Sequence, residues 1–393
     1  MRIAIVVHGR WDAFDLAREL DRRGVEVTLL TNYPAWAVAR YGVRPTHVRS
    51  FVVHGACARL AARVGAEQRA EALLHKAFGQ WAARELAKED WDVVYAFSGV
   101  AEESFRVLLN RPTLRVLVRE SAHIRAQTRL LSDEEQRTGI RQSRPSRWRI
   151  DREEREYELA DVIRLLSSFT YDTFIEHGIH PDRLALILSG AAVARFRPSL
   201  EVIRARVSRI EAGAPLNVLN VGTFALRKGV WDMAAVVRTL GTTRFRFRFV
   251  GPILAEARDI AEELTQAGVE FVPKQVEADL PAAYAWGDVF VLPSIEDGFQ
   301  AVLAQASAAG LPILTTPNGA GHDLVRDGLN GWVLPIRTPD AFAHQLNWAD
   351  RHRAQLAGMV WDTYERFRPR NFSQVAAELE HLCRSHLAPL AIA

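Results

Sequence analysis

Cysteine is the scarcest residue type here, with two in 393 residues, Cys57 and Cys383. They lie far apart and lack metal-ligand spacing, which excludes a disulfide-rich scaffold and a cysteine-based zinc site. We therefore expect reduced thiols in a cytoplasmic protein. No apolar run approaches the ~20 residues that a membrane-spanning helix needs. The apolar start, residues 2–7, is too short for a signal peptide and predicts a first strand.

The sequence also lacks the marks of several enzyme classes. No GxGxxG follows a predicted strand, which argues against a nicotinamide-dependent oxidoreductase. We find no internal repeat, no low-complexity tract, no nucleic-acid-binding motif and no obvious nucleophile. The length allows two domains of roughly 150–200 residues each. A hydrophobic content of 48% and a charged content of 25% are those of a soluble globular enzyme.

Charge is divided unevenly along the chain. Residues 1–200 hold 31 Lys and Arg against 26 Asp and Glu, whereas the remainder holds 19 against 21. This excess is compatible with an anionic membrane surface or a phosphate-bearing acceptor. A genome that favours arginine everywhere is the simpler explanation. The Arg-rich segment 130–155 leads into several glutamates, which favours a solvated, salt-bridged helix over a binding patch. Segment 59–86 predicts mostly helix, with Leu73, Leu74 and Phe78 as core.

The most informative stretch is residues 288–325. Residues 289–292 predict a buried strand, apolar residues at helical spacing follow from Ala301, and residues 311–315 predict a second strand. Asp297 precedes the helix and Gln305 lies on it. In such a unit polar groups gather at the carboxyl ends of parallel strands, where α/β sheets bind ligands. The carboxylate could accept bonds from sugar hydroxyls, and an ordinary βαβ unit with an acidic helix cap is the alternative.

Two loops of the first half are further candidates. Gly9 and Arg10 follow the first predicted strand, and Arg10 is either a phosphate contact or a solvated turn residue. Residues 114–118 predict a buried strand. Arg119 and Glu120 follow it directly, and His123 comes three residues later. The carboxyl end of a strand is where a functional histidine would lie. A lone histidine is nevertheless more often structural.

A third candidate loop opens the second half. Residues 216–221 predict a strand, and Gly222 to Gly229 follow it with Arg227 and Lys228 between the glycines. Two cations in a glycine-flanked loop before a helix are well placed to neutralise a diphosphate. Residues 199–215 predict a largely polar linker helix, and residues 361–382 predict a helical end.

Several motifs together resemble the donor-site signature of family 4 glycosyltransferases. They are Pro293-Ser-Ile-Glu-Asp-Gly-Phe, Gln305-Ala, Gly310-Leu-Pro-Ile-Leu-Thr and the segment from Gly319 to Gly331. The family pattern Glu-x7-Glu reads Asp297-x7-Gln305 here. The segment from Arg119 to Gln127 is similar to an Arg-x-Ser-x-His-Ile-x-x-Gln stretch of some relatives. The family's Gly-Arg-x-Lys-Gly loop is matched at Lys228, but its arginine position holds Thr223.

The resemblance implies a GT-B fold, in which two Rossmann-like domains face a cleft. It implies an N-terminal acceptor-side domain (1–198), a donor domain (199–368) and a C-terminal helix that returns to the first domain (369–393). It implies catalytic roles for His123, Asp297 and Lys228, and acceptor contacts by Arg119 and Glu120. The implied donor-binding residues are Gly9, Arg10, Gly222, Thr223, Arg227, Lys228, Pro273, Lys274, Asp297, Gly298, Phe299, Gln300, Ala301 and Gln305.

We accordingly expect a retaining, metal-independent glycosyltransferase without a cofactor, whose donor is a UDP- or GDP-type nucleotide sugar. The acceptor would be a glycan or a lipid-linked molecule used in cell-surface polysaccharide, lipopolysaccharide or glycolipid synthesis. A cytoplasmic location, with peripheral contact between the basic first domain and the inner membrane face, is compatible with this expectation. A catalytically degenerate nucleotide-sugar-binding protein and a GT-B epimerase are the alternatives.

Overall fold

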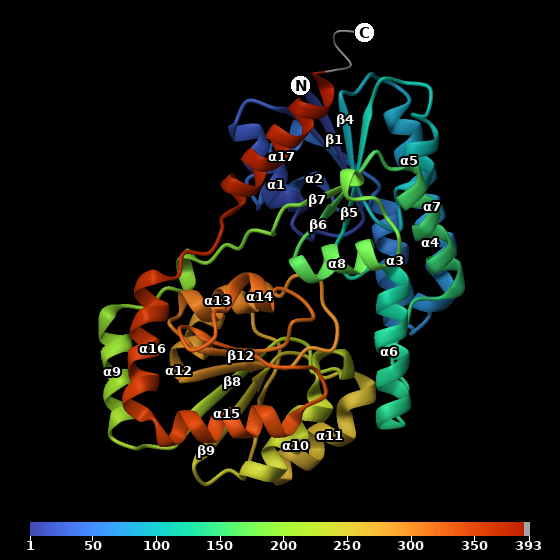
Figure 1. The fold of residues 1–393 in the computed structure, drawn as a ribbon. Coiled ribbons are helices and arrows are strands. Elements are labelled where there is room, and N and C mark those ends of the chain that lie inside the picture. Colours follow the sequence, from blue (N-terminus) through green and yellow to red (C-terminus); the bar gives the residue numbers. More distant parts are fainter. Residues whose placement is uncertain (389–393) are drawn as a thin grey trace.

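The computed structural model describes residues 1–388. It contains two parallel β-sheets, each enclosed by helices, stacked as two lobes in Figure 1. The first sheet has the order β3-β2-β1-β4-β5-β6-β7 and the second β10-β9-β8-β11-β12-β13. The strands are β1 (Arg2–Val7), β2 (Glu26–Thr31), β3 (Val48–Ser50), β4 (Val93–Phe97), β5 (Leu114–Arg119), β6 (Val162–Leu165), β7 (Leu184–Leu186), β8 (Leu216–Val221), β9 (Phe245–Val250), β10 (Glu270–Val272), β11 (Val289–Leu292), β12 (Ile313–Thr315) and β13 (Gly331–Val333).

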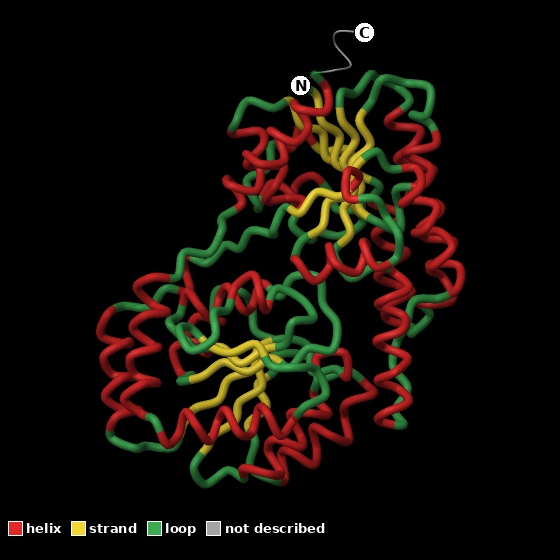
Figure 2. The backbone as a smooth tube through the Cα atoms, viewed as in Figure 1, coloured by secondary structure: helices red, strands yellow, loops and turns green. Residues whose placement is uncertain are grey.

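The helices cover both faces of each sheet, and the loops between the lobes come from strand ends (Figure 2). The helices are α1 (Ala13–Arg22), α2 (Ala35–Ala39), α3 (Val52–Arg63), α4 (Glu67–Leu86), α5 (Glu102–Arg106), α6 (Ile124–Thr138), α7 (Arg147–Leu159), α8 (Ser168–Glu176), α9 (Leu200–Glu211), α10 (Val230–Leu240), α11 (Arg258–Gln266), α12 (Leu280–Trp286), α13 (Ala301–Ala308), α14 (Gly321–Leu324), α15 (Pro339–Arg351), α16 (Arg353–Arg366) and α17 (Phe372–Leu387).

Burial on both faces explains the unbroken apolar runs of the central strands. Every residue of β4, β8 and β11 is buried, as are all but the first of β1. Such strands cannot alternate between polar and apolar residues, because helices pack on each side of a parallel sheet. In both sheets the order reverses beside the first strand, β1 or β8. Ligands bind at such switch points, beyond the carboxyl ends of the strands.

The last helix returns to the first domain, as the resemblance implies. Residues 367–371 break the helical end that the sequence predicts over 361–382, and Pro369 lies in this break. Helix α17 then packs on α1, where Arg23 and Glu380 form a 2.7 Å ion pair. Its buried Leu379 and Cys383 join the core of the first domain. Residues 389–393 of the predicted C-terminal segment lie outside the described residues.

Helix α7 corrects the prediction of a solvated, salt-bridged helix. The Arg152 side chain is 2% exposed and pairs with Glu103 at 2.5 Å, Glu102 at 3.4 Å and Glu156 at 3.2 Å. Glu156 also accepts backbone N–H bonds at the carboxyl end of β4. The charges build a buried network that joins α7 to α5 and to the end of the sheet. The spacing of arginines and glutamates in the sequence could not distinguish this buried network from ion pairs on a solvated helix.

Helix α6 extends from the first domain along the second (Figure 1). Its Arg137 pairs with Asp232 of α10 at 2.7 Å, and its Glu134 pairs with Arg337 at 3.0 Å. A further contact between the domains is made by Asp323 of α14, which accepts a bond from the backbone N–H of Ser168 at 3.0 Å. The two domains therefore touch at several points. Among the described residues, no helix is long and apolar enough to cross a membrane.

Candidate active site between the two domains

Loops at the carboxyl ends of both sheets meet and enclose two cavities. One, of about 330 Å³, is lined from the first domain by Arg10, Asp12 and Glu120 and from the second by Asp297, Ala301 and Gln305. The other, of about 570 Å³, is lined by residues that include Arg119, Gln127, Thr223 and Arg227. We call them the inner and the outer cavity. Both have walls from both domains, so a ligand in either would touch both.

Lys228 and Asp297 form an ion pair beside these cavities, although 69 residues separate them. Lys228 ends a 3-10 turn after β8, and Asp297 follows β11, the neighbouring strand. Gly229 makes this approach possible, because it has φ +74° and a Cβ there would lie 1.9 Å from the Pro293 carbonyl oxygen. Burial and then the charge of Arg227 lower the pKa of Lys228. The negative charge of Glu296 opposes that shift because it favours the ammonium form.

Gln305 lines the inner cavity from α13, with a second residue behind it. The Tyr284 hydroxyl donates to Gln305 Oε1 at 2.7 Å, and Tyr284 is fully buried. The amide oxygen is thus used within the protein, which leaves the amide N–H groups as the part of Gln305 that a ligand can meet. Ala301, at the start of α13, lines the same cavity.

Gln300 was predicted among the donor contacts, and the structure places it in the interior. It is 3% exposed, its Oε1 accepts from the Ala320 backbone N–H at 2.7 Å, and its amide donates to the Asn318 carbonyl at 3.2 Å. Both amide groups are therefore occupied by the glycine turn before α14. Gln300 supports that turn, and its predicted donor contact stays a prediction.

The loop after β1 forms part of the opposite wall. The Gly9 backbone N–H donates to Asn32 Oδ1 at 2.9 Å, and Gly9 has φ +110°. The Arg10 guanidinium stacks on Tyr41 at 4.1 Å and lies 3.8 Å from Glu277 of the second domain. Arg10 thus reaches across the inner cavity, as a phosphate or sugar contact there would require.

Trp11 is a residue of this wall that sequence reasoning missed. It is 56% exposed, lines the inner cavity and has φ +42°, a backbone conformation that side chains other than glycine seldom adopt. Its indole N–H donates to the His8 carbonyl at 3.2 Å. An exposed indole at a cavity of this kind could stack on a sugar ring.

Glu120 lines the inner cavity above a buried charged cluster. Arg164 is fully buried, lies 3.3 Å from Asp12 and bonds the Tyr95 hydroxyl, yet among the described residues its Nε and Nη2 have no acceptor. Asp12 Oδ1 is likewise without a donor. Burial and then the Asp12 charge raise the pKa of Glu120 well above its usual value. At the edge of the cavity the Asp12 carboxylate thus pairs with the buried Arg164, and its charge disfavours ionisation of the Glu120 carboxyl.

The inner and outer cavities are separated by a direct contact between the domains. Glu296 is fully buried, and its carboxylate accepts from the Ser121 hydroxyl, the Ala122 backbone N–H at 3.2 Å and the Gln127 amide at 3.1 Å. Gly298 lies against the Glu120 carbonyl, where a Cβ would approach the oxygen to 1.7 Å. The absence of a side chain at this glycine lets the domains come together.

His123 lies behind this contact and lines neither cavity. It is 4% exposed, stacks on His177 at 4.2 Å, and packs edge-on against Phe174. Its Nδ1 accepts the Arg125 N–H at the start of α6, at 3.3 Å. Burial and then His177 lower the pKa of His123 to about 3. In this conformation His123 is a neutral helix cap, and its predicted catalytic role stays a prediction.

The other predicted residues divide between the outer cavity and the surface. Arg119 lines the outer cavity, where it pairs with Glu153 at 2.9 Å and donates to Gln127 at 2.8 Å. Thr223 and Arg227 line it from the second domain, and Arg227 lies 3.8 Å from Glu296. Gly222, with φ +146°, precedes Thr223 and lines neither cavity.

Two predicted donor contacts, Pro273 and Lys274, are exposed beyond β10, outside both cavities. Glu277, farther along the same loop, lines the inner cavity in their place. Phe299 also lines that cavity and packs against the core of the first domain.

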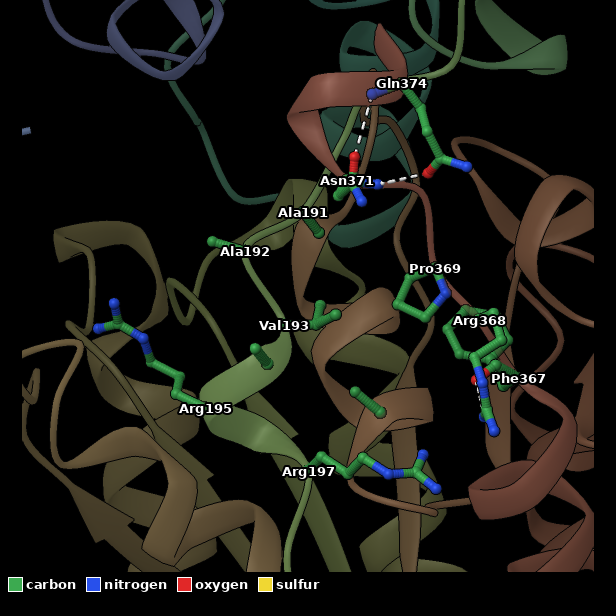
Figure 3. Close-up of a pocket in the computed structure, with 12 residues that line it drawn as sticks. Ala191, Ala192, Val193, Arg195, Arg197, Phe367, Arg368, Pro369, Asn371 and Gln374 are labelled. Atoms are coloured by element: carbon green, nitrogen blue, oxygen red, sulfur yellow. Dashed lines mark hydrogen bonds between the residues drawn. The ribbon is translucent and has the colours of Figure 1, made fainter. Parts of the chain in front are cut away.

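A third cavity, of about 610 Å³, lies at the hinge where residues 191–197 and 367–374 connect the domains (Figure 3). Two of its three arginines cap the end of α16: Arg197 donates to the Tyr364 carbonyl at 2.7 Å, and Arg368 to the Phe367 carbonyl at 2.9 Å. The third, Arg195, lies 3.6 Å from Glu277. Asn371 and Gln374, joined by dashed lines in Figure 3, form a capping box for α17. These side chains have structural tasks, and we assign this cavity to the hinge.

Comparison with known proteins agrees with this geometry. Residues 13–195 match the family model described as Glycosyltransferase Family 4, and residues 215–349 match the model described as Glycosyl transferases group 1. The chain belongs to the family 4-like glycosyltransferases. A GDP-mannose-dependent alpha-mannosyltransferase of Mycobacterium tuberculosis is 31% identical over 239 residues, which are 56% of this chain and 60% of that protein.

A putative colanic acid biosynthesis glycosyltransferase, WcaL of Salmonella typhimurium, is 26% identical over 51% of this chain and 48% of its own length. The chain thus spans about half to three fifths of these curated relatives. The solved structure of Anabaena Alr3699/HepE in complex with UDP has a TM-score of 0.68 at 16% identity, over 98% of this chain and all of that one. That likeness confirms the GT-B fold.

Several site residues of this family 4-like glycosyltransferase were not predicted from the sequence. Asp12, Arg164 and Glu296 lie on three separate elements and share no motif. Glu296 stands in the donor-site signature directly before Asp297. Its position beside that predicted site residue is the feature of the sequence that could have pointed to it. The buried Arg164 interrupts an otherwise apolar strand, β6, which is a usable sign of a functional or paired charge.

Proposed function

We propose that this protein is a retaining, metal-independent glycosyltransferase that moves a sugar from a nucleoside-diphosphate sugar to an acceptor hydroxyl. The observation that carries the proposal is the Lys228–Asp297 pair, which lies at the switch point of the second sheet. Arg10 and Glu120 of the first domain face it across the inner cavity. A cation and a carboxylate side by side suit the two halves of such a donor, the diphosphate and the sugar.

The second domain would hold the donor. Lys228 and Arg227 would stabilise the negative charge that grows on the departing diphosphate, which is electrostatic work that a metal ion performs in other enzymes. Asp297 would accept bonds from sugar hydroxyls once Lys228 turns to the phosphate. Gln305 would donate an amide N–H to a ribose oxygen, because Tyr284 already occupies its own oxygen.

The first domain would hold the acceptor. Glu120 lines the inner cavity beside Asp12, and both face the side on which Asp297 lies. A neutral Glu120 would donate to an acceptor hydroxyl, and the Asp12 carboxylate would accept from one. Trp11 would offer a flat surface to the ring. Arg119 is tied to Glu153 and Gln127, so its contribution would be to position Gln127 rather than to touch the acceptor.

The chemistry would proceed with retention of the anomeric configuration. The acceptor oxygen would bond to the anomeric carbon on the face from which the nucleoside diphosphate departs, and an oxygen of that phosphate would take the acceptor proton. No protein nucleophile is required by this route. Proton NMR of the first product formed reads the anomer directly, and an inverted product would exclude retention.

The class of substrate is proposed from the relatives. The Mycobacterium tuberculosis relative is described as GDP-mannose-dependent and the WcaL relative as a colanic acid biosynthesis enzyme. The Anabaena structure holds UDP. We therefore propose a GDP- or UDP-sugar donor and an acceptor used in cell-surface polysaccharide or glycolipid synthesis.

The test is thermal unfolding with a panel of nucleoside diphosphates and nucleotide sugars, with and without magnesium. A ligand at ~100 times its Kd stabilises the native state by about 2.7 kcal/mol, which is a Tm rise of about 5–10 °C for a domain of this size. Lys228→Ala should abolish the rise. Lys88→Ala, which removes an exposed cation far from the cleft, should preserve it.

Three results would contradict parts of the proposal. If no nucleotide raises Tm, the donor site is wrong. If the rise requires magnesium, metal independence is wrong. If the nucleotide binds but no acceptor is glycosylated, the degenerate binding protein is the better description, with Thr223 and Gln305 as the departures that explain it.

A further inference from the structure

The surface helix α3 turns a row of apolar side chains towards solvent. Val53, Cys57, Leu60 and Val64 follow one another at spacings of four, three and four residues, which places them on one face. Val53 is 69% exposed, Leu60 62% and Val64 68%, and Cys57 is exposed as well. Single exposed apolar residues are ordinary, but a continuous stripe at helical spacing marks an interaction surface.

The opposite face of α3 explains why the stripe cannot turn inward. Gly55 packs so closely on the Asn32 carbonyl that a Cβ would lie 2.4 Å from its oxygen. His54 is buried, stacks with Phe51 and lies 3.0 Å from the Leu74 carbonyl oxygen. Small and aromatic groups thus fix the helix in one rotation about its axis. The apolar stripe is held towards solvent by this packing.

The charges beside the stripe indicate its partner. Residues 51–66 contain no aspartate or glutamate. They contain Arg59 and Arg63, both exposed, which lie on one side of the helix between the apolar stripe and the Gly55 face. On the following helix, α4, the exposed Leu73 lies between Arg69 and Lys76 at helical spacing, so its predicted place in the core is wrong. Apolar side chains flanked by cations without anions match the boundary of an anionic bilayer, where acyl chains lie beneath phosphate groups.

We propose that α3 is an interfacial helix that docks the first domain on an anionic lipid bilayer through Val53, Leu60 and Val64, with Arg59 and Arg63 on lipid phosphates. The helix also connects to the active site. Asn32, on which Gly55 packs, accepts the Gly9 N–H at the wall of the inner cavity. Docking would therefore bring the first-domain wall of the cleft close to the membrane surface.

Membrane docking through α3 goes beyond the proposed glycosyl transfer. It restricts the acceptors that reach the cleft to those anchored in, or gathered at, the membrane. Its test needs neither donor nor acceptor. Vesicle binding can therefore fail while nucleotide binding persists, and the reverse can also occur. The two proposals are distinguishable by independent measurements.

The experiment is co-sedimentation of the full chain with vesicles of phosphatidylcholine alone or mixed with phosphatidylglycerol. We expect binding to the mixed vesicles and little to the neutral ones. Leu60→Asp should reduce the partition coefficient at least about tenfold. The double variant Arg59→Gln, Arg63→Gln should reduce it by about 30-fold. The matched controls, Leu109→Asp and Arg22→Gln, change exposed residues elsewhere on the first domain and should bind as the unmodified protein does.

Cys57 supplies a second readout within the stripe itself. It is exposed, whereas Cys383 is fully buried, so a thiol-directed, polarity-sensitive fluorophore labels Cys57 alone in the folded protein. Mixed vesicles should shift its emission to the blue. The proposal is overturned if the emission does not move, if Leu60→Asp binds vesicles as well as the unmodified chain, or if the stripe instead forms a dimer in sedimentation velocity that Leu60→Asp dissociates.

Discussion

Gly298→Ala should slow turnover without unfolding the protein. Gly298 has no positive φ, so alanine is compatible with its backbone, and the obstacle is the neighbouring domain. A Cβ would lie 1.7 Å from the Glu120 carbonyl oxygen, 2.3 Å from its carbon and 2.9 Å from the Ser121 nitrogen. These are backbone atoms at the end of β5, which cannot swing aside as a long side chain can.

The size of the effect follows from the overlap. Ordinary contact needs roughly 3.5 Å, so the domains would have to separate by about 1.5–2 Å at this point. A misplacement of ~1 Å in a reacting pair can cost about 100-fold in rate, or about 2.7 kcal/mol of transition-state stabilisation. We therefore expect kcat to fall by about 100-fold. The Kd for the nucleoside diphosphate, which the second domain would hold, should change only a few-fold.

The assay combines three measurements on purified Gly298→Ala: release of nucleoside diphosphate during transfer, nucleotide binding by calorimetry, and thermal unfolding. Gly358→Ala in α16 is the matched control. Outside the helix's own neighbouring backbone, no heavy atom of the described residues lies within 4 Å of a Cβ there, and alanine favours the helix by up to about 1 kcal/mol. If Gly298→Ala turns over as fast as the unmodified protein, the contact between Gly298 and Glu120 is not part of the productive closed state.

Two further predictions concern buried charges. Arg152→Met should lower the free energy of unfolding by about 3–5 kcal/mol in urea titrations, because it leaves buried carboxylates without their partner; Arg147→Met on the same helix, whose side chain is 95% exposed, should change it by less than ~0.5 kcal/mol. Since burial raises the pKa of Glu120, the folded state holds that proton more tightly than the unfolded state. The free energy of unfolding should therefore fall as pH rises from 4.5 towards the raised pKa, and Glu120→Gln should remove this slope, measured by urea unfolding across pH. An unchanged slope would show that Glu120 is ionised in the folded protein.

Much of the fold could be predicted because it depends on local pattern. Continuous apolar runs such as residues 289–292 are typical of strands covered on both faces, and the glycines at 229 and 310 mark turns that need a positive φ. The strand–loop–helix pattern around Asp297 predicts a carboxylate at a strand end, and Asp297 does follow β11. The same local logic places Lys228 in the loop after β8.

The pairing of distant residues could not be predicted from such patterns. The sequence offers no relation between Glu296 and Ser121, which are 175 residues apart, or between Arg164 and Asp12. Helical spacing says which residues share a face, but the same spacing describes a face that meets solvent and one that meets the core. Leu73 was therefore predicted as core and is exposed, whereas Arg152 was predicted as solvated and is buried.

By itself, then, the sequence determined two parallel-sheet domains, the strand ends at which a ligand would bind, and the family to which the chain belongs. These follow from short-range periodicity, from turn residues and from a linear signature. The tertiary structure decided which charges meet: Lys228 with Asp297, Glu296 with the opposite domain, and Arg164 with Asp12. It also decided that His123 turns inward and that the apolar face of α3 turns outward. Such outcomes depend on how packed elements occupy space, and no local pattern encodes that arrangement.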